Sequence, residues 1–145
     1  MTCIAGLLFS KFNSILMPLS AETKKEITEK LSAALRKCVP PMVIESQSKD
    51  GMQLMGNKPV PYGYAKKIVP GMYFCSFVAR KDMVSFYFFP MYMNSEFLKL
   101  IPNLSKTLKG KTCFKIKKPE QIHDKELAAL LKKGIAAFKK LGYMK

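Results

Sequence analysis

The sequence predicts an α+β domain in which a mostly antiparallel sheet packs against an N-terminal and a C-terminal helix. Two long segments carry apolar residues at every third or fourth position, and several shorter ones alternate apolar and polar residues. Strands and helices do not alternate regularly along the chain, which excludes a doubly wound fold. The 145 residues suit one domain over positions 1–145, because single cores typically span about 100–150 residues.

Three segments are predicted to be helical. The first covers residues 20–38, where Ser20 can cap the N-terminus and the apolar residues line up on one face. The last covers residues 123–141, and Gly142 suits its C-terminal end. Residues 95–109 are predicted to be helical in two pieces, because a proline interrupts them.

The strand signals lie between these helices. Residues 42–55 predict a short hairpin around an Asp-Gly turn, and residues 72–80 with 83–93 predict a second, longer hairpin. The segment 83–93 is apolar on both faces, which is typical of a central strand covered on both sides or of a pocket wall. Residues 111–117 predict a further strand, with Phe114 on the core side.

The segment 56–71 is predicted to be a turn-rich loop, since glycines and prolines punctuate it throughout. Loops of this length are uncommon inside compact domains and are often functional. Tyrosines in it can stack on a ring while lysines supply positive charge, which suits a nucleotide or another aromatic anion. An alternative is a proline-stiffened connector whose tyrosines cover the sheet. The candidate ligand-binding residues are Lys58, Tyr62, Tyr64, Lys66 and Lys67.

The chain is strongly basic, with a formal net charge of +15 at pH 7. Its last third, residues 99–145, holds 13 lysines and three acidic residues. Lysines at 111, 115 and 117 would share one face of the predicted strand, so Lys111, Lys115 and Lys117 are candidate anion-binding residues. The alternative is that they guard a sheet edge against pairing. Because only two arginines are present, sequence-specific nucleic-acid recognition is disfavoured, whereas non-specific attraction to phosphates stays open.

Metal and catalytic chemistry find little support in the sequence. His123 is the single histidine, so one chain cannot supply a His-His metal pair. The four cysteines are at least 35 residues apart, which excludes a Cys-x-x-Cys motif and favours reduced, mostly buried thiols. Phosphate-loop, dinucleotide and serine-hydrolase fingerprints are missing from the sequence. We therefore expect no resident metal or cofactor and favour a non-enzymatic protein.

The N-terminal segment does not resemble a targeting signal. Residues 1–9 are apolar, but no basic residue precedes them and Lys11 interrupts the run early. We expect a cytoplasmic protein without membrane association, in which residues 1–19 form a peripheral extension or part of the fold. The sequence leaves the oligomeric state open.

Three phrases in the second half of the chain resemble a known family. They are the aromatic block Phe86–Met93, the segment Leu108–Phe114 around Lys-Gly-Lys, and the stretch from Leu130 to Tyr143. Their order and spacing are similar to the small bacterial YdhG-like family of unknown function, which implies an antiparallel α+β domain. One branch of that family is described as a frataxin-like iron chaperone. Iron delivery needs clustered carboxylates, whereas the ten acidic residues here are scattered among lysines, so this role is disfavoured.

Taken together, these features predict a small binding module for an anionic or aromatic ligand near residues 56–71. The alternative is a basic protein that associates non-specifically with nucleic acid.

Overall fold

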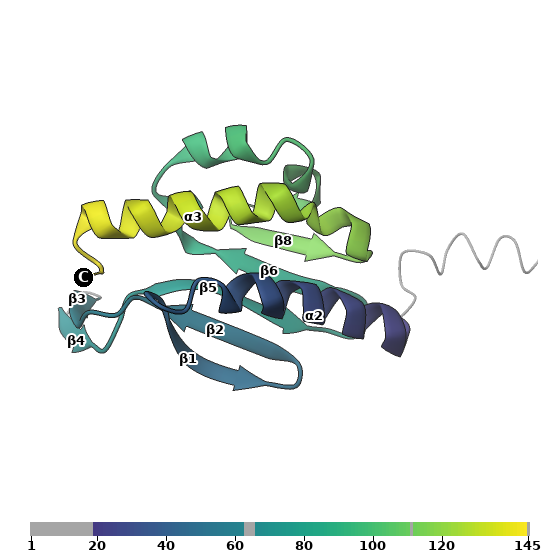
Figure 1. Ribbon diagram of the computed structural model, residues 1–145, viewed down its shortest axis with the longest axis horizontal. Coiled ribbons are helices and arrows are strands. Elements are labelled where there is room, and N and C mark those ends of the chain that lie inside the picture. Colours follow the sequence, from purple (N-terminus) through teal and green to yellow (C-terminus); the bar gives the residue numbers. More distant parts are fainter. Residues whose placement is uncertain (1–18, 63–65, 111, 145) are drawn as a thin grey trace, which may run out of the picture.

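The computed structural model describes residues 19–62, 66–110 and 112–144 and contains two long helices on one face of a six-stranded sheet (Figure 1). The helices are α2 (Ala21–Arg36) and α3 (Asp124–Leu141), and they run in the same direction. This arrangement confirms the predicted α+β fold. The prediction for residues 1–19 falls almost entirely outside the described residues.

The sheet has the strand order β1-β2-β5-β6-β8-β7, and every neighbouring pair is antiparallel. Both predicted hairpins are present, and β6 lies centrally, between β5 and β8. The strands are β1 (Val43–Ser48), β2 (Gly51–Met55), β5 (Tyr73–Ala79), β6 (Val84–Phe88), β7 (Leu108–Lys109) and β8 (Cys113–Ile116).

The core lies between the sheet and the two helices. Val84, Phe86 and Phe88 alternate along β6 and are fully buried, while the residues between them belong to the opposite face. On β8 the same alternation buries Phe114 and Ile116 completely, and the prediction that Phe114 faces the core is confirmed. Burial of such large apolar side chains is the main stabilising contribution, at about 25 cal/mol per Å² removed from water.

Helix α3 approaches the sheet closely at Gly134. A β-carbon at this position would lie 2.5 Å from Cζ of Phe88 and 2.9 Å from Cε1 of Phe74. Only glycine therefore lets the helix backbone rest on these two rings. Further along α3, Phe138 packs edge-on against Phe74, with ring centroids 5.0 Å apart.

The predicted helix ends are confirmed within two residues. The Ser20 hydroxyl accepts the N–H of Thr23 at 3.1 Å, so it caps α2 as expected. At the other end of the chain, Gly142 has a φ of +80° and its N–H donates to the carbonyl of Lys139. That left-handed residue ends α3, because glycine adopts this conformation without strain.

Three sequence predictions need correction. Part of the segment 56–71 is a separate two-stranded ribbon, β3 (Val60–Tyr62) and β4 (Lys67–Val69), rather than loop throughout. The strand predicted for 83–93 ends at Phe88, because Pro90 cannot donate a ladder hydrogen bond and starts the 3-10 helix η1 (Phe89–Tyr92).

The predicted broken helix at 95–109 consists of two 3-10 helices, η2 (Ser95–Leu100) and η3 (Leu104–Thr107), followed by the short edge strand β7. A fourth 3-10 helix, η4 (Pro119–Ile122), leads into α3. Pro102 lies between η2 and η3, and Pro119 starts η4. Short helices are expected in both segments, because proline inside a long helix removes a hydrogen bond.

Candidate functional site

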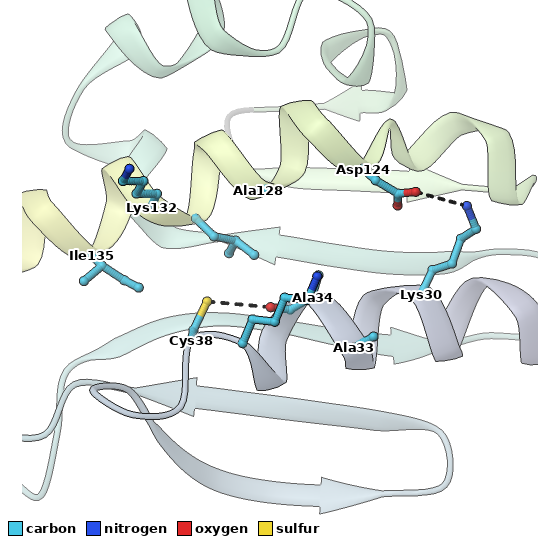
Figure 2. A pocket seen from close by; sticks show the side chains of 10 residues that line it. Lys30, Ala33, Ala34, Cys38, Asp124, Ala128, Lys132 and Ile135 are labelled. Atoms are coloured by element: carbon cyan, nitrogen blue, oxygen red, sulfur yellow. Dashed lines mark hydrogen bonds and ion pairs between the residues drawn. The ribbon is translucent and has the colours of Figure 1, made fainter.

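A groove of about 490 Å³ lies between α2 and α3 (Figure 2). Each helix turns its large apolar residues down onto the sheet, among them Leu31 and Leu35 on α2 and Leu127 and Leu130 on α3. Three of the positions between the two helices hold alanine, namely Ala33, Ala34 and Ala128. Because alanines cannot fill the space between two helices, a hollow remains there. The groove is lined by Lys30, Ala33, Ala34, Lys37, Cys38, Asp124, Ala128, Leu131, Lys132 and Ile135.

Apolar atoms form most of the groove, and charged groups surround it. Three lysines and one aspartate belong to its lining, which leaves a local excess of two positive charges. The Nζ of Lys30 lies 3.4 Å from Oδ2 of Asp124 and closes one end (Figure 2). Lys37 and Lys132 are exposed and form no ion pair with the described residues. They are therefore available to an anionic group.

Cys38 lies toward the other end of the groove, near Ile135 (Figure 2). Cys38 is 5% exposed, and its thiol donates to the carbonyl of Ala34, with Sγ and O 3.8 Å apart. Burial raises the pKa of Cys38 to about 11, so the thiol is protonated at neutral pH. The reactive form of cysteine is the thiolate, and this residue is consequently a poor nucleophile.

The predicted ligand site around residues 56–71 has a different character. Tyr62 and Lys67 are directly opposite each other in the β3–β4 ribbon, and Tyr62 is 57% exposed. Lys58 and Lys66 are exposed as well, whereas Tyr64 lies outside the described residues. None of these described side chains lines the helix groove, the lysine-lined hollow described below, or two smaller cavities of about 210 and 290 Å³. The ribbon therefore offers a surface, and ligand binding there stays a prediction.

Two of the predicted anion-binding residues do share a cavity. Lys115 and Lys117 line a hollow of about 450 Å³ on the far side of β8 from the core, together with lysines from neighbouring elements. Lys111 lies outside the described residues. The complete lining of this hollow is Asp82, Met83, Lys106, Thr107, Lys109, Lys115, Lys117 and Gln121.

The titratable residues considered for catalysis or metal binding do not assemble in the described chain. His123 is exposed and precedes α3 with a φ of +50°. Cys38 and Cys75 are buried, as expected for most of the cysteines, and Cys113 is half-buried; none of these three described cysteines is joined in a disulfide. Across residues 19–62, 66–110 and 112–144, no group of three or more histidine, cysteine or acidic side chains gathers as a metal site.

Comparisons with protein-family models, with curated proteins and with solved structures find no match for this chain. The resemblance to YdhG-like proteins therefore stays a prediction. Neither helix of the described part combines the length and the apolar character that crossing a membrane requires.

Sequence reasoning missed the helix groove. Its one signal in the sequence is a pair of adjacent alanines in each helix, Ala33-Ala34 and Ala128-Ala129, within otherwise well-patterned apolar faces. The sequence does not say that these two segments, almost 100 positions apart, lie next to each other. The groove could not be recognised before the helices were placed on the same face of the sheet.

Proposed function

We propose that the chain is a non-enzymatic binding module that holds a small amphipathic anion in the groove between α2 and α3. The observation that carries the proposal is a cavity of about 490 Å³ that combines alanine and branched apolar walls with unpaired lysines. The ligand class agrees with the anionic ligand expected from the sequence. The proposed location differs from the segment 56–71.

The two parts of such a ligand would use different parts of the groove. An alkyl or aromatic body would contact Ala34, Leu131 and Ile135 and displace water from them, which stabilises the complex by about 0.8 kcal/mol per buried methylene. A carboxylate, sulfate or phosphate head would lie at Lys37 and Lys132. Ligand pockets commonly combine apolar walls with a few polar groups in this way.

A calorimetric titration of the full chain with hexanoate, octanoate and decanoate tests this proposal. Because each buried methylene adds about 0.8 kcal/mol, the dissociation constant is expected to fall about fourfold per methylene until the groove is full. Octanol, which has the same chain length without the charge, should bind more weakly than octanoate. The double variant Lys37→Gln/Lys132→Gln should weaken octanoate at least fivefold and change octanol less than twofold.

The matched control is Lys133→Gln/Lys139→Gln, which removes the same charge from exposed positions of α3 that do not line the groove. Equal weakening in both double variants would contradict the proposal, because it would reduce the effect to net charge. Affinity that does not change with chain length would also contradict it. A further variant replaces Leu7 and Leu8 by aspartate. If octanoate binds only to this variant, the chain's own first residues occupy the groove in the wild type, which contradicts the proposal. A dimer that is broken by Ala128→Phe would likewise assign it to a second copy.

A further inference from the structure

The lysine-lined hollow on the other side of the sheet forms a second positively charged site. Its four lysines come from three consecutive elements: Lys106 from η3, Lys109 from β7, and Lys115 and Lys117 from β8 and the residue that follows it. They are close together although the chain turns sharply between them. This hollow does not share any lining residue with the groove between α2 and α3.

The strand register explains why these side chains share one face. Phe114 and Ile116 are fully buried on the core side, so Cys113 and Lys115 point away from the core, and Lys117 continues that alternation. Lys109 pairs directly with Cys113 across the β7–β8 ladder and therefore belongs to the same outer face. Three of the four lysines are thus placed by the sheet itself.

Protection of a sheet edge accounts for only part of this cluster. β7 is the edge strand on this side of the sheet, and Lys109 suits the task of preventing edge pairing. Lys115 lies on β8 and pairs with Ser85 of β6, one residue beyond the β7 ladder, which reaches only Cys113 and Phe114. Lys106 belongs to the 3-10 helix η3 and to no strand, so it has no sheet edge to guard, and edge protection does not explain the whole cluster.

The charge in this hollow is largely uncompensated. None of the four lysines forms an ion pair with a described residue, and Asp82 is the one acidic side chain in the lining. Gln121 Oε1 accepts the backbone N–H groups of Lys117 and Lys118 at 2.7 and 3.0 Å. This contact fixes the backbone that carries Lys117. The hollow therefore presents an excess of three positive charges on a fixed framework.

We infer that this hollow is a binding site for phosphate groups, carried by an oligophosphate or by the backbone of a single-stranded nucleic acid. Several phosphates at close spacing match several ammonium groups that converge on a cavity of about 450 Å³. Lysine acts as a hydrated point charge rather than as a bidentate fork, so the site would recognise charge and spacing and not base sequence.

Isothermal titration of the full chain with sodium tripolyphosphate at fixed ionic strength tests this site. The double variant Lys115→Gln/Lys117→Gln is expected to raise the dissociation constant about tenfold or more. The control Lys139→Gln/Lys140→Gln removes the same charge from exposed positions at the end of α3 and should change it less than twofold. All four positions are at least partly exposed, so these variants are expected to keep the fold, as circular dichroism would show.

A second titration with a twelve-residue oligothymidylate distinguishes the two sources of phosphate. Contact of all four lysines with phosphates predicts a slope of about −2.8 for log K against log salt, which Lys115→Gln/Lys117→Gln should bring to about −1.4. Oligonucleotide binding with this change supports a nucleic-acid backbone, and tripolyphosphate binding alone supports a free oligophosphate. The inference is overturned if the wild type binds neither probe, or if both double variants lose affinity equally. The variant Lys37→Gln/Lys132→Gln should leave both titrations unchanged, so this test is independent of the helix groove.

Discussion

At the scale of single residues, Glu126 joins the 3-10 helix η3 to α3. Its Oε1 accepts the backbone N–H groups of Asn103 at 3.0 Å and Leu104 at 2.9 Å, and its Oε2 accepts Nδ2 of Asn103 at 2.8 Å. Desolvation alone would raise the pKa of Glu126, but these three hydrogen bonds favour the carboxylate and lower the pKa below its ordinary value. The Glu126 carboxylate thus accepts hydrogen bonds from two backbone N–H groups at the N-terminus of η3.

Replacing this carboxylate should destabilise the protein in a pH-dependent way. We expect Glu126→Ala to reduce the free energy of unfolding at pH 7 by about 1 kcal/mol, as for the loss of a helix cap. Because the folded-state pKa is lowered, the stabilisation is complete above the ordinary pKa of 4.5 and is lost as the pH falls through the folded-state value. The difference between wild type and variant should therefore shrink below pH 4.5.

Urea denaturation at pH 7 and at several values below 4.5 measures this difference. The control is Glu120→Ala, at an exposed acidic position with no hydrogen bond or ion pair to the described residues, which should stay within about 0.5 kcal/mol of wild type at each pH. A Glu126→Ala effect that is constant from pH 7 to pH 3 would show that the carboxylate charge does not contribute.

At the scale of elements, the groove results from how two helices rest on one sheet. Gly134 and Phe138 hold α3 against the rings of Phe74 and Phe88, and the larger apolar residues of α2 are directed to the same sheet face. The contact between the helices is left to small residues such as Ala33 and Ala128, which do not close it. The sheet therefore sets the helix spacing, and the alanines leave the space open.

Filling this space should remove ligand binding without unfolding the protein. We expect Ala128→Phe to weaken octanoate binding at least tenfold, because an aromatic ring would occupy volume that the ligand needs. Its thermal midpoint should change little, since Ala128 is exposed. The matched control is Ala136→Phe, at an exposed position of the same helix that does not line the groove. Calorimetric titration of both variants with octanoate measures this difference. Unchanged octanoate affinity in Ala128→Phe would show that the ligand binds elsewhere.

At the scale of the whole molecule, the net charge is +15, and the lysines of the last third of the chain lie on two kinds of surface. The lysines of α3 beyond Lys132 belong to its solvent side, whereas those of η3, β7 and β8 converge on one hollow. Only two ion pairs join described residues, so most of this charge is not compensated within the described chain. Total charge alone does not distinguish a solvated surface from a binding site. The position of each lysine on the fold makes that distinction.

Local patterns predicted most of the fold. The 3.6-residue periodicity, the Ser20 cap and the Gly142 stop predicted α2 and α3, because such signals are properties of the element itself. The Asp50-Gly51 turn signal predicted the first hairpin, and alternation predicted the first strand of the second hairpin and the outward direction of Lys115 on β8. The ribbon at β3 and β4 was missed, since its strands are three residues long and Pro61 interrupts the usual pattern.

The candidate sites depend on contacts between distant segments and were predicted less well. The lysine hollow was partly predicted because Lys115 and Lys117 are close in sequence, whereas Lys106 joins them only through the β7–β8 pairing. The groove was not predicted at all, because its walls come from the two ends of the described chain. Tyr62 and Lys67 were selected for their chemistry, and the structure shows them exposed on a two-stranded ribbon.

The most direct test of the central proposal is a methyl-resolved NMR titration of the full chain with octanoate, in which alanine and isoleucine methyl groups report the place of binding. We expect saturable shifts at Ala33, Ala34, Ala128 and Ile135, the methyl-bearing residues of these two types along the groove. The methyl group of Ala79, which lies on β5 and does not line the groove, should stay unperturbed. Shifts confined to Ile68 in the β3–β4 ribbon, or the absence of any saturable shift, would contradict a ligand site between α2 and α3.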